Sequence, residues 1–283
     1  MKLASFKLKG KDTWGVVTDA GVIDCGAKFG KKYPDLKALI ASKGIAEVKA
    51  YAAKRKPDAK LAQIKFNPVI GNADKILCAG LNYKDHIAET GRSDSAYPTF
   101  FTRFNNSQVG HNQPIVRPKA SHHLDYEGEL AVIIGKKGRH IKAADALKHV
   151  AGYSCYNDGS IRDWQRHTTQ FIPGKNFPAT GGFGPWMVTA DQIKDPTTMT
   201  LITRLNGQEM QKTTTDLMVF PIPVLIEYCS SFTELVPGDV IVTGTPGGVG
   251  FKRNPPVYMK PGDIVEIDIT KVGVLKNTIV DEK

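Results

Sequence analysis

The sequence predicts a mostly β protein with some α-helix, an α+β fold built as a mixed β-roll or barrel with helices on its outside. Short apolar or alternating runs bounded by Gly, Pro, Asn and Asp recur along the chain, as in strands, whereas helical spacing is rarer. At 283 residues the chain is long enough for a small domain plus a larger one, and the sequence pattern changes near Pro68, after which short apolar runs end at glycine. We therefore expect a small N-terminal α+β domain at residues 1–70 and a larger domain at 71–283.

The N-terminal segment contains candidate strands followed by a helical region. Residues 5–9 and 13–17 alternate like paired strands, and 22–25 is a third short strand. Residues 36–54 have helical spacing and many alanines, with an interruption at Gly44. This segment offers no residues that suggest catalysis.

The larger segment alternates short strands with turns and a few helices. We expect strands at 75–80, 98–104, 127–135, 152–158, 187–189, 201–205, 208–212, 240–242 and 265–269, the last one closing the chain. We expect helices at 84–89, 143–149 and 223–232. The glycine-rich run 181–186 is interpreted as a turn before strand 187–189, and it matches neither a P-loop nor a dinucleotide-binding turn.

Composition narrows the class of protein. The formal charge is +10, but the lysines are spread out, which favours a solvated surface over a nucleic-acid-binding stripe and would also attract a small anionic substrate. No apolar run is long enough to span a bilayer, and the N-terminus lacks the apolar core of a signal peptide, so we expect a cytoplasmic protein. The four scattered cysteines fit reduced thiols.

Two carboxylates stand at the start of a strongly apolar, β-branched run. Side chains two apart on a strand point to the same face, so Glu127 and Glu129 should lie side by side. Close carboxylates favour a hard divalent cation such as Mg²⁺ or Mn²⁺. The alternative is a polar strand start with two solvated glutamates.

Two further candidates carry their own alternatives. Asp158 ends a strand and is a possible third oxygen ligand or a helix N-cap. His86 and Glu89 share a face of a helical turn, so Glu89 could hold His86 as a general base, or the two could form a surface contact.

Cationic and polar residues near these candidates in the sequence could contact a substrate. Lys175 is either a fixed point charge for an anion or a surface lysine. Arg162 and Gln165 could contact substrate oxygens, and Arg103 could bind a carboxylate or only extend toward solvent. The polar run 90–97, which includes Gly91, Arg92 and Ser93, could be a mobile lid.

A glycine-rich loop, 243–250, follows the last buried strand of the candidate core. Its backbone N–H groups and the hydroxyl of Thr245 could approach an anion, or the loop could be a plain turn.

The order of these motifs resembles the fumarylacetoacetate hydrolase family over about residues 70–280. The motifs are Gly80–His86, Glu127-x-Glu129, Asn157-Asp158 with Arg162 and Gln165, Gly174-Lys175, and Thr243–Gly250. The resemblance implies a β-roll domain that usually forms a homodimer and binds Mg²⁺ or Mn²⁺ through Glu127, Glu129 and Asp158.

The resemblance also implies roles for the other residues. His86 with Glu89 would activate water, Lys175 would stabilise an enolate or oxyanion, and Arg162, Gln165 and Thr245 would contact substrate. Tyr83 and Arg103 are expected among the substrate contacts, although many relatives have lysine at the position of Arg103. Ala79 stands where larger members carry a further aspartate ligand, which indicates the shorter, three-carboxylate branch.

These roles suggest a metal-dependent hydrolase that cleaves a C–C bond in 2,4-diketo acids of the acylpyruvate or fumarylpyruvate type, in a catabolic pathway. The alternative on the same site is an isomerase or decarboxylase of 2-hydroxymuconate-type diacids, since tautomerisation and decarboxylation pass through the same enolate. A basic nucleic-acid-binding protein is a remote third alternative.

Overall fold

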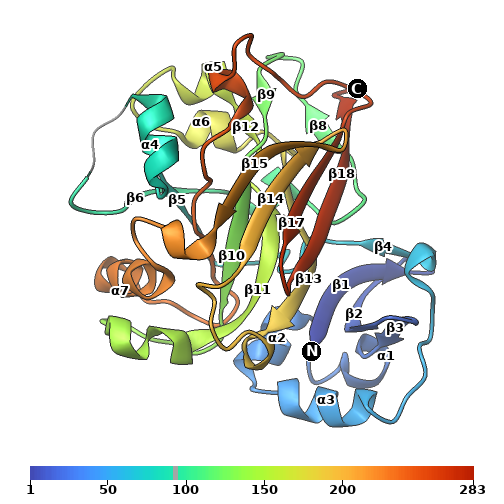
Figure 1. The fold of residues 1–283 in the computed structure, drawn as a ribbon. Helices are drawn as coiled ribbons and strands as arrows, with labels where there is room; N and C mark the ends of the chain where they lie inside the picture. The colour runs from blue at the N-terminus through green and yellow to red at the C-terminus, as the bar shows by residue number, and fades with distance from the viewer. Residues whose placement is uncertain (92–94) are drawn as a thin grey trace.

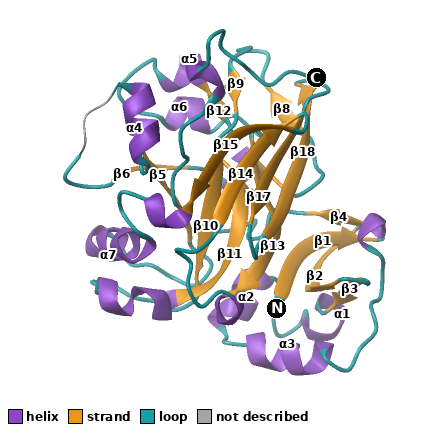
Figure 2. Ribbon diagram, viewed as in Figure 1, coloured by secondary structure: helices purple, strands orange, loops and turns teal. Residues whose placement is uncertain are grey.

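The protein is described here by a computed structural model of residues 1–91 and 95–283, and it is organised around two β-sheets (Figures 1 and 2). In the described residues, a large mixed sheet of eleven strands packs against a five-stranded sheet, and a two-stranded ribbon lies at one end. Helices lie outside the strands, as Figure 2 shows, so the predicted β-roll with peripheral helices is confirmed.

The strands of the large sheet run in the order β3 (Gly21–Asp24), β2 (Lys11–Thr18), β1 (Lys2–Leu8), β13 (Gly181–Thr189), β11 (Val150–Asn157), β10 (Gly128–Ile134), β16 (Val240–Val242), β5 (Ile76–Gly80) and β6 (Thr99–Thr102), with β4 (Ile64–Phe66) beside β1 and β7 (Gln108–Val109) beside β13. The second sheet has the order β15 (Gln208–Thr214), β14 (Thr200–Leu205), β17 (Ile264–Ile269), β18 (Gly273–Asp281) and β8 (Ile115–Arg117). The ribbon pairs β12 (Ser160–Ile161) with β9 (Leu124–Asp125).

The α-helices are α1 (Gly26–Phe29), α2 (Leu36–Ala41), α3 (Ile45–Ala52), α4 (Lys84–Thr90), α5 (Arg162–Gln165), α6 (Ile172–Lys175) and α7 (Ile222–Phe232). Short 3₁₀ helices are η1 (Leu61–Gln63), η2 (Asn105–Ser107), η3 (Ala143–His149), η4 (Ala190–Gln192), η5 (Thr215–Leu217) and η6 (Gly250–Lys252). In Figure 1, α4, α5 and α6 gather near β9 and β12 at the upper end of the molecule.

Strand β10 explains why two glutamates can be buried at its start. Every residue of β10 is buried, as expected for a strand covered on both faces. Its alternate residues enter different hydrophobic clusters, with Leu130 and Val132 in one and Ala131 and Ile133 in the other. Glu129 has the parity of the second pair, so its side chain points away from the five-stranded sheet.

Gly128 gives the five-stranded sheet room to approach β10. A Cβ on Gly128 would lie 2.0 Å from the Thr203 hydroxyl of β14, so no other residue fits there without movement. Tight packing on one face of β10 thus leaves the opposite face for the carboxylates.

The N-terminal strands continue the large sheet. Strand β1 pairs antiparallel with β13, with Leu3 opposite Met187. Trp14 belongs to the same hydrophobic cluster as Ala131 and Phe183. Residues on both sides of position 70 therefore share one sheet and one hydrophobic cluster. The division into domains at 1–70 and 71–283 stays a prediction.

Two predicted elements are wrong. The run 181–186 is not a turn, because β13 extends through it to Thr189. Its glycines serve close packing: a Cβ on Gly182 would lie 2.6 Å from Asn277 Oδ1. The chain also does not close with residues 265–269, since β18 follows, its apolar alternation masked by the polar residues Lys276, Asn277 and Thr278.

The remaining fold predictions have mixed outcomes. The helices on both sides of Gly44 are confirmed, the helix predicted at 223–232 is α7, and 143–149 is helical with 3₁₀ geometry. All four cysteines are buried and free. No helix in the described ranges combines the length and apolarity needed to cross a membrane. Residues 92–94 of the predicted lid, Arg92, Ser93 and Asp94, lie outside the described residues.

Candidate active site

Three buried carboxylates meet where two neighbouring strands of the large sheet end. Glu127 precedes β10, Glu129 is its second residue, and Asp158 follows β11. Antiparallel pairing sets Glu129 opposite Tyr156, and the Asp158 N–H donates to the Glu127 carbonyl over 2.9 Å. Each side chain offers an oxygen within 4.8 Å of the other two, and all three are at most 5% exposed. The solvated strand start is therefore wrong.

Cations hold two of the three carboxylates. Lys175 Nζ lies 2.6 Å from Glu127 and 2.7 Å from Asp158. Arg162 Nη1 lies 2.7 Å from Glu127, and Arg103 Nη1 lies 2.6 Å from Asp158. Burial opposes ionisation of Glu127, but the neighbouring Lys175 and Arg162 outweigh it and lower its pKa to about 2.

Glu129 lacks such a partner in the described part of the chain. Its carboxylate accepts a hydrogen bond from the Gly244 N–H. Burial, followed by the negative charges of Asp158 and Glu127, raises the pKa of Glu129 well above its usual value. A divalent cation among the three carboxylates would supply the positive charge that Glu129 lacks. Three carboxylate groups are also the hard oxygen donors that Mg²⁺ and Mn²⁺ prefer, so the residues fit such a metal.

Helix α4 brings a histidine to the site. His86 Nδ1 lies 2.7 Å from Glu89 Oε1, and the other Glu89 oxygen accepts from the Gly248 N–H over 2.9 Å. Glu89 is thus fixed from two sides and orients the imidazole. Because Nδ1 is engaged, Nε2 is the ring nitrogen left to exchange a proton. His86 is only 6% exposed, which contradicts the alternative of a surface contact.

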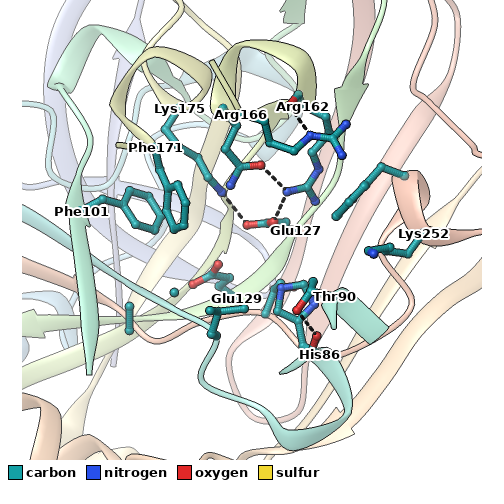
Figure 3. A pocket seen from close by; sticks show the side chains of 16 residues that line it. His86, Thr90, Phe101, Glu127, Glu129, Arg162, Arg166, Phe171, Lys175 and Lys252 are labelled. Carbon is teal, nitrogen blue, oxygen red and sulfur yellow. Dashed lines mark hydrogen bonds and ion pairs between the residues drawn. The ribbon is translucent and has the colours of Figure 1, made fainter. Parts of the chain in front are cut away.

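These groups surround a cavity of about 140 Å³ (Figure 3). The predicted site residues that line it are His86, Glu127, Glu129, Arg162, Gln165, Lys175 and Thr245. In Figure 3, Arg162 and Lys175 lie on one side of Glu127, and His86 lies on the opposite side beyond Glu129. Asp158 and Glu89 are not part of the lining, but each contacts a residue that is, Asp158 through Lys175 and Glu89 through His86. The arrangement sets a base across a small cavity from fixed positive charge.

Comparisons with known proteins identify the family. Residues 75–280 match the family model described as fumarylacetoacetate (FAA) hydrolase, C-terminal. The chain belongs to the fumarylacetoacetate hydrolase family. Members of this family are enzymes, so the cavity between His86 and the carboxylates is the candidate active site of an enzyme.

Individual relatives in this family differ in reaction. The chain is 39% identical over 265 residues to the mitochondrial oxaloacetate tautomerase FAHD2A of Bos taurus, covering 92% of this chain and 84% of the relative. A fumarylacetoacetate hydrolase structure from Exiguobacterium antarcticum matches with a TM-score of 0.83 and 33% identity. A maleylpyruvate hydrolase structure from Sphingobium sp. SYK-6, in complex with manganese(II) and pyruvate, matches with a TM-score of 0.84 and 30% identity. Both structural matches cover 100% of each chain.

The glycine-rich loop 243–250 binds carboxylates of the protein itself through its backbone N–H groups. Its N–H groups at Gly244, Gly248 and Gly250 donate to three carboxylates of the protein itself. The loop therefore fixes the side chains of Glu129, Glu89 and Asp125. The Thr245 hydroxyl donates to the Gly128 carbonyl and accepts from Gln211 Nε2, which joins the loop to β10 and β15.

Asp125 is a site residue that the sequence reasoning missed. It is fully buried, and its oxygens accept from Arg162 Nε over 2.8 Å and from the Gly250 and Phe251 N–H groups over 2.9 and 3.0 Å. It therefore holds Arg162 and the loop end together. The sequence pattern that could have indicated it is its spacing: Asp125 is acidic and lies two positions before Glu127, so on a continuous strand its side chain would point to the same face.

Two predicted substrate contacts lie away from the cavity lining. Arg103 is 2% exposed, and besides Asp158 its guanidinium donates to Ser107, Gly159 and Thr180, so its donors are committed within the protein. Tyr83 is fully buried. Arg103 acts from behind Asp158 as a structural partner. Gln165 does line the cavity, where its Oε1 accepts from Arg162 Nη1.

Proposed function

We propose that this enzyme moves a proton at the carbon next to the carbonyl of a small 2-oxo acid, interconverting the keto and enol forms of oxaloacetate or a close analogue. The observation that carries the proposal is the oriented His86–Glu89 pair facing the carboxylate triad and Lys175 across a cavity of about 140 Å³. A cavity of this size suits a compact oxo acid. The likeness to an oxaloacetate tautomerase over 92% of the chain supports the same reaction.

The chain's own residues account for the proton transfer. His86 Nε2 takes the proton from carbon 3, and the ionised Glu89 stabilises the imidazolium that results. The ammonium of Lys175 and the guanidinium of Arg162 provide a fixed positive field for the charge that develops on the carbonyl oxygen. The proton then returns from His86 to that oxygen to give the enol. Mg²⁺ or Mn²⁺ bound by Glu127, Glu129 and Asp158 would supply Lewis-acid polarisation of the carbonyl.

Hydrolysis of 2,4-diketo acids is the second candidate. The carboxylate-held His86 is also arranged as a base that can deprotonate water, and the maleylpyruvate hydrolase with manganese(II) and pyruvate shares the fold. In this reaction hydroxide attacks the 4-carbonyl, and the C–C bond breaks to release pyruvate. Isomerisation or decarboxylation of 2-hydroxymuconate-type diacids would use the same residues.

A substrate panel separates these reactions. Purified protein with Mg²⁺ or Mn²⁺ is given enol-oxaloacetate, an acylpyruvate and a 2-hydroxymuconate-type diacid, with absorbance of the enol and release of pyruvate followed in parallel. We expect rapid loss of the oxaloacetate enol band without pyruvate beyond the spontaneous rate. Rapid pyruvate release from the acylpyruvate, with no effect on oxaloacetate, would overturn tautomerisation in favour of hydrolysis.

We further propose that the protein acts as a homodimer in the cytoplasm and takes an anionic keto acid, without a nucleic-acid or membrane partner. The net positive charge supports an anionic substrate. Light scattering on the purified protein tests the dimer.

A further inference from the structure

Three cations surround one aromatic ring at the edge of the cavity. The Arg162 guanidinium lies 4.3 Å from the centroid of the Phe251 ring, the Arg166 guanidinium 5.3 Å, and Lys252 Nζ 5.5 Å. All four residues line the cavity, and Figure 3 labels Arg162, Arg166 and Lys252 around it.

The three cations differ in whether a carboxylate of the protein pairs with them. Arg162 is buried and paired with Asp125 and Glu127. Within the described residues, neither Arg166 nor Lys252 has an ion pair with a carboxylate, and both side chains are exposed. Two like charges beside the same ring repel each other, so an anion bound near both would be favoured.

The geometry also orients the Arg166 side chain and positions the backbone before Lys252. Arg166 Nε donates to the Arg162 carbonyl over 3.2 Å, which leaves its terminal nitrogens for a ligand. Lys252 follows Phe251, whose N–H is held by the buried Asp125. Because Asp125 also holds Arg162, one buried carboxylate positions the ring and the arginine that packs on it.

We propose that Arg166 and Lys252 bind the distal carboxylate of a 2-oxo diacid whose oxo-carboxylate end is held at the triad. The inference rests on the proposed function for the position of that near end. It adds that the enzyme selects oxo acids that carry a distal carboxylate over those that lack one, and it assigns the selection to these two residues.

Binding of two non-reacting probes tests the selection without measuring turnover. Oxalate and N-oxalylglycine are both dianions, but oxalate occupies the near end alone, whereas N-oxalylglycine carries its second carboxylate at the distal end. Dissociation constants for both are measured by calorimetry on the Mn²⁺-loaded protein, for wild type, Arg166→Ala, Lys252→Ala and the double variant. Lys119→Ala, an exposed lysine outside the cavity lining, is the control.

We expect each single variant to weaken N-oxalylglycine binding about threefold and the double variant about tenfold, the size expected of exposed charge pairs. Oxalate binding and the control variant should change less than twofold. The effect should shrink as ionic strength rises, because exposed charges are screened. Lys252→Arg should retain affinity for N-oxalylglycine.

Equal losses for both probes, or no loss for N-oxalylglycine in the double variant, would overturn the proposed subsite. Failure of oxalate to bind to the wild-type protein would instead contradict the proposed function, so the two failures are distinguishable. Near-ultraviolet circular dichroism of each variant confirms that its fold is unchanged.

Discussion

Replacement of Glu129 by glutamine should abolish metal binding without damaging the fold. Glu129 is the carboxylate of the triad that lacks a cationic partner among the described residues, and its pKa is raised by burial and by Asp158 and Glu127. Glutamine keeps the shape and can still accept the hydrogen bond from the Gly244 N–H. Removing a buried charge from a carboxylate cluster relieves repulsion, so the metal-free variant should be at least as stable as the metal-free wild type at neutral pH.

The size of the effect follows from binding linkage. At a Mg²⁺ or Mn²⁺ concentration of about 100 times the dissociation constant, metal binding stabilises the wild type by about 2.7 kcal/mol. At roughly 2–4 °C per kcal/mol for a chain of this size, Tm should rise by about 5–10 °C. Glu129→Gln should show a rise close to zero, because the two carboxylates that remain are already paired with cations, Glu127 with Lys175 and Arg162, and Asp158 with Lys175 and Arg103.

Thermal denaturation with and without metal, followed by circular dichroism, measures this effect. Glu209→Gln, at an exposed position on β15, is the matched control and should keep the full rise. A full metal-dependent rise in Glu129→Gln would refute the assignment of the metal to this triad.

The remaining predictions concern the base, the buried support and pH. His86→Asn should lower the tautomerisation rate by about 10²–10⁴-fold while metal binding measured by calorimetry stays intact; loss of both together would mean that His86 acts on the metal site. Asp125→Asn should lower the free energy of unfolding in urea by about 1.5–3 kcal/mol, since it removes one of the two carboxylates that pair with the buried Arg162; an unchanged midpoint would contradict this role. Gly248→Ala should cost about 1–3 kcal/mol, because φ is +96° and a Cβ would lie 2.3 Å from the Met210 carbonyl. Metal affinity should increase as pH rises above the usual range of a glutamate, since the raised pKa of Glu129 lets a proton compete with the metal; affinity independent of pH from 5 to 8 would argue against this competition.

Local pattern was enough to predict where the carboxylates lie. Glu127 and Glu129 share a side because of strand alternation, and Asp158 joins them because β11 is the antiparallel neighbour of β10. The His86–Glu89 contact follows from helical spacing within one turn. The first and last of these arrangements depend on periodicity over a few residues, whereas the position of Asp158 depends on the pairing of two strands.

Long-range packing decided what the sequence could not show. Arg103 was predicted to contact substrate because it is a lone cation among aromatic residues. Its guanidinium instead donates hydrogen bonds to Asp158 and Thr180, which are 55 and 77 residues away in the sequence. The role of Asp125 depends on the loop at Gly250, which is 125 residues away. The glycines of β13 suggested a turn because local sequence does not show that Asn277 packs against them.

Exchange of the carbon-3 protons of a 2-oxo acid with D₂O tests the central claim most directly. Proton NMR with excess Mg²⁺ should show protein-catalysed deuterium incorporation that disappears in chelator, in Glu129→Gln and in His86→Asn. Exchange that continues unchanged in chelator or in His86→Asn would contradict proton transfer by His86 at a metal-dependent site.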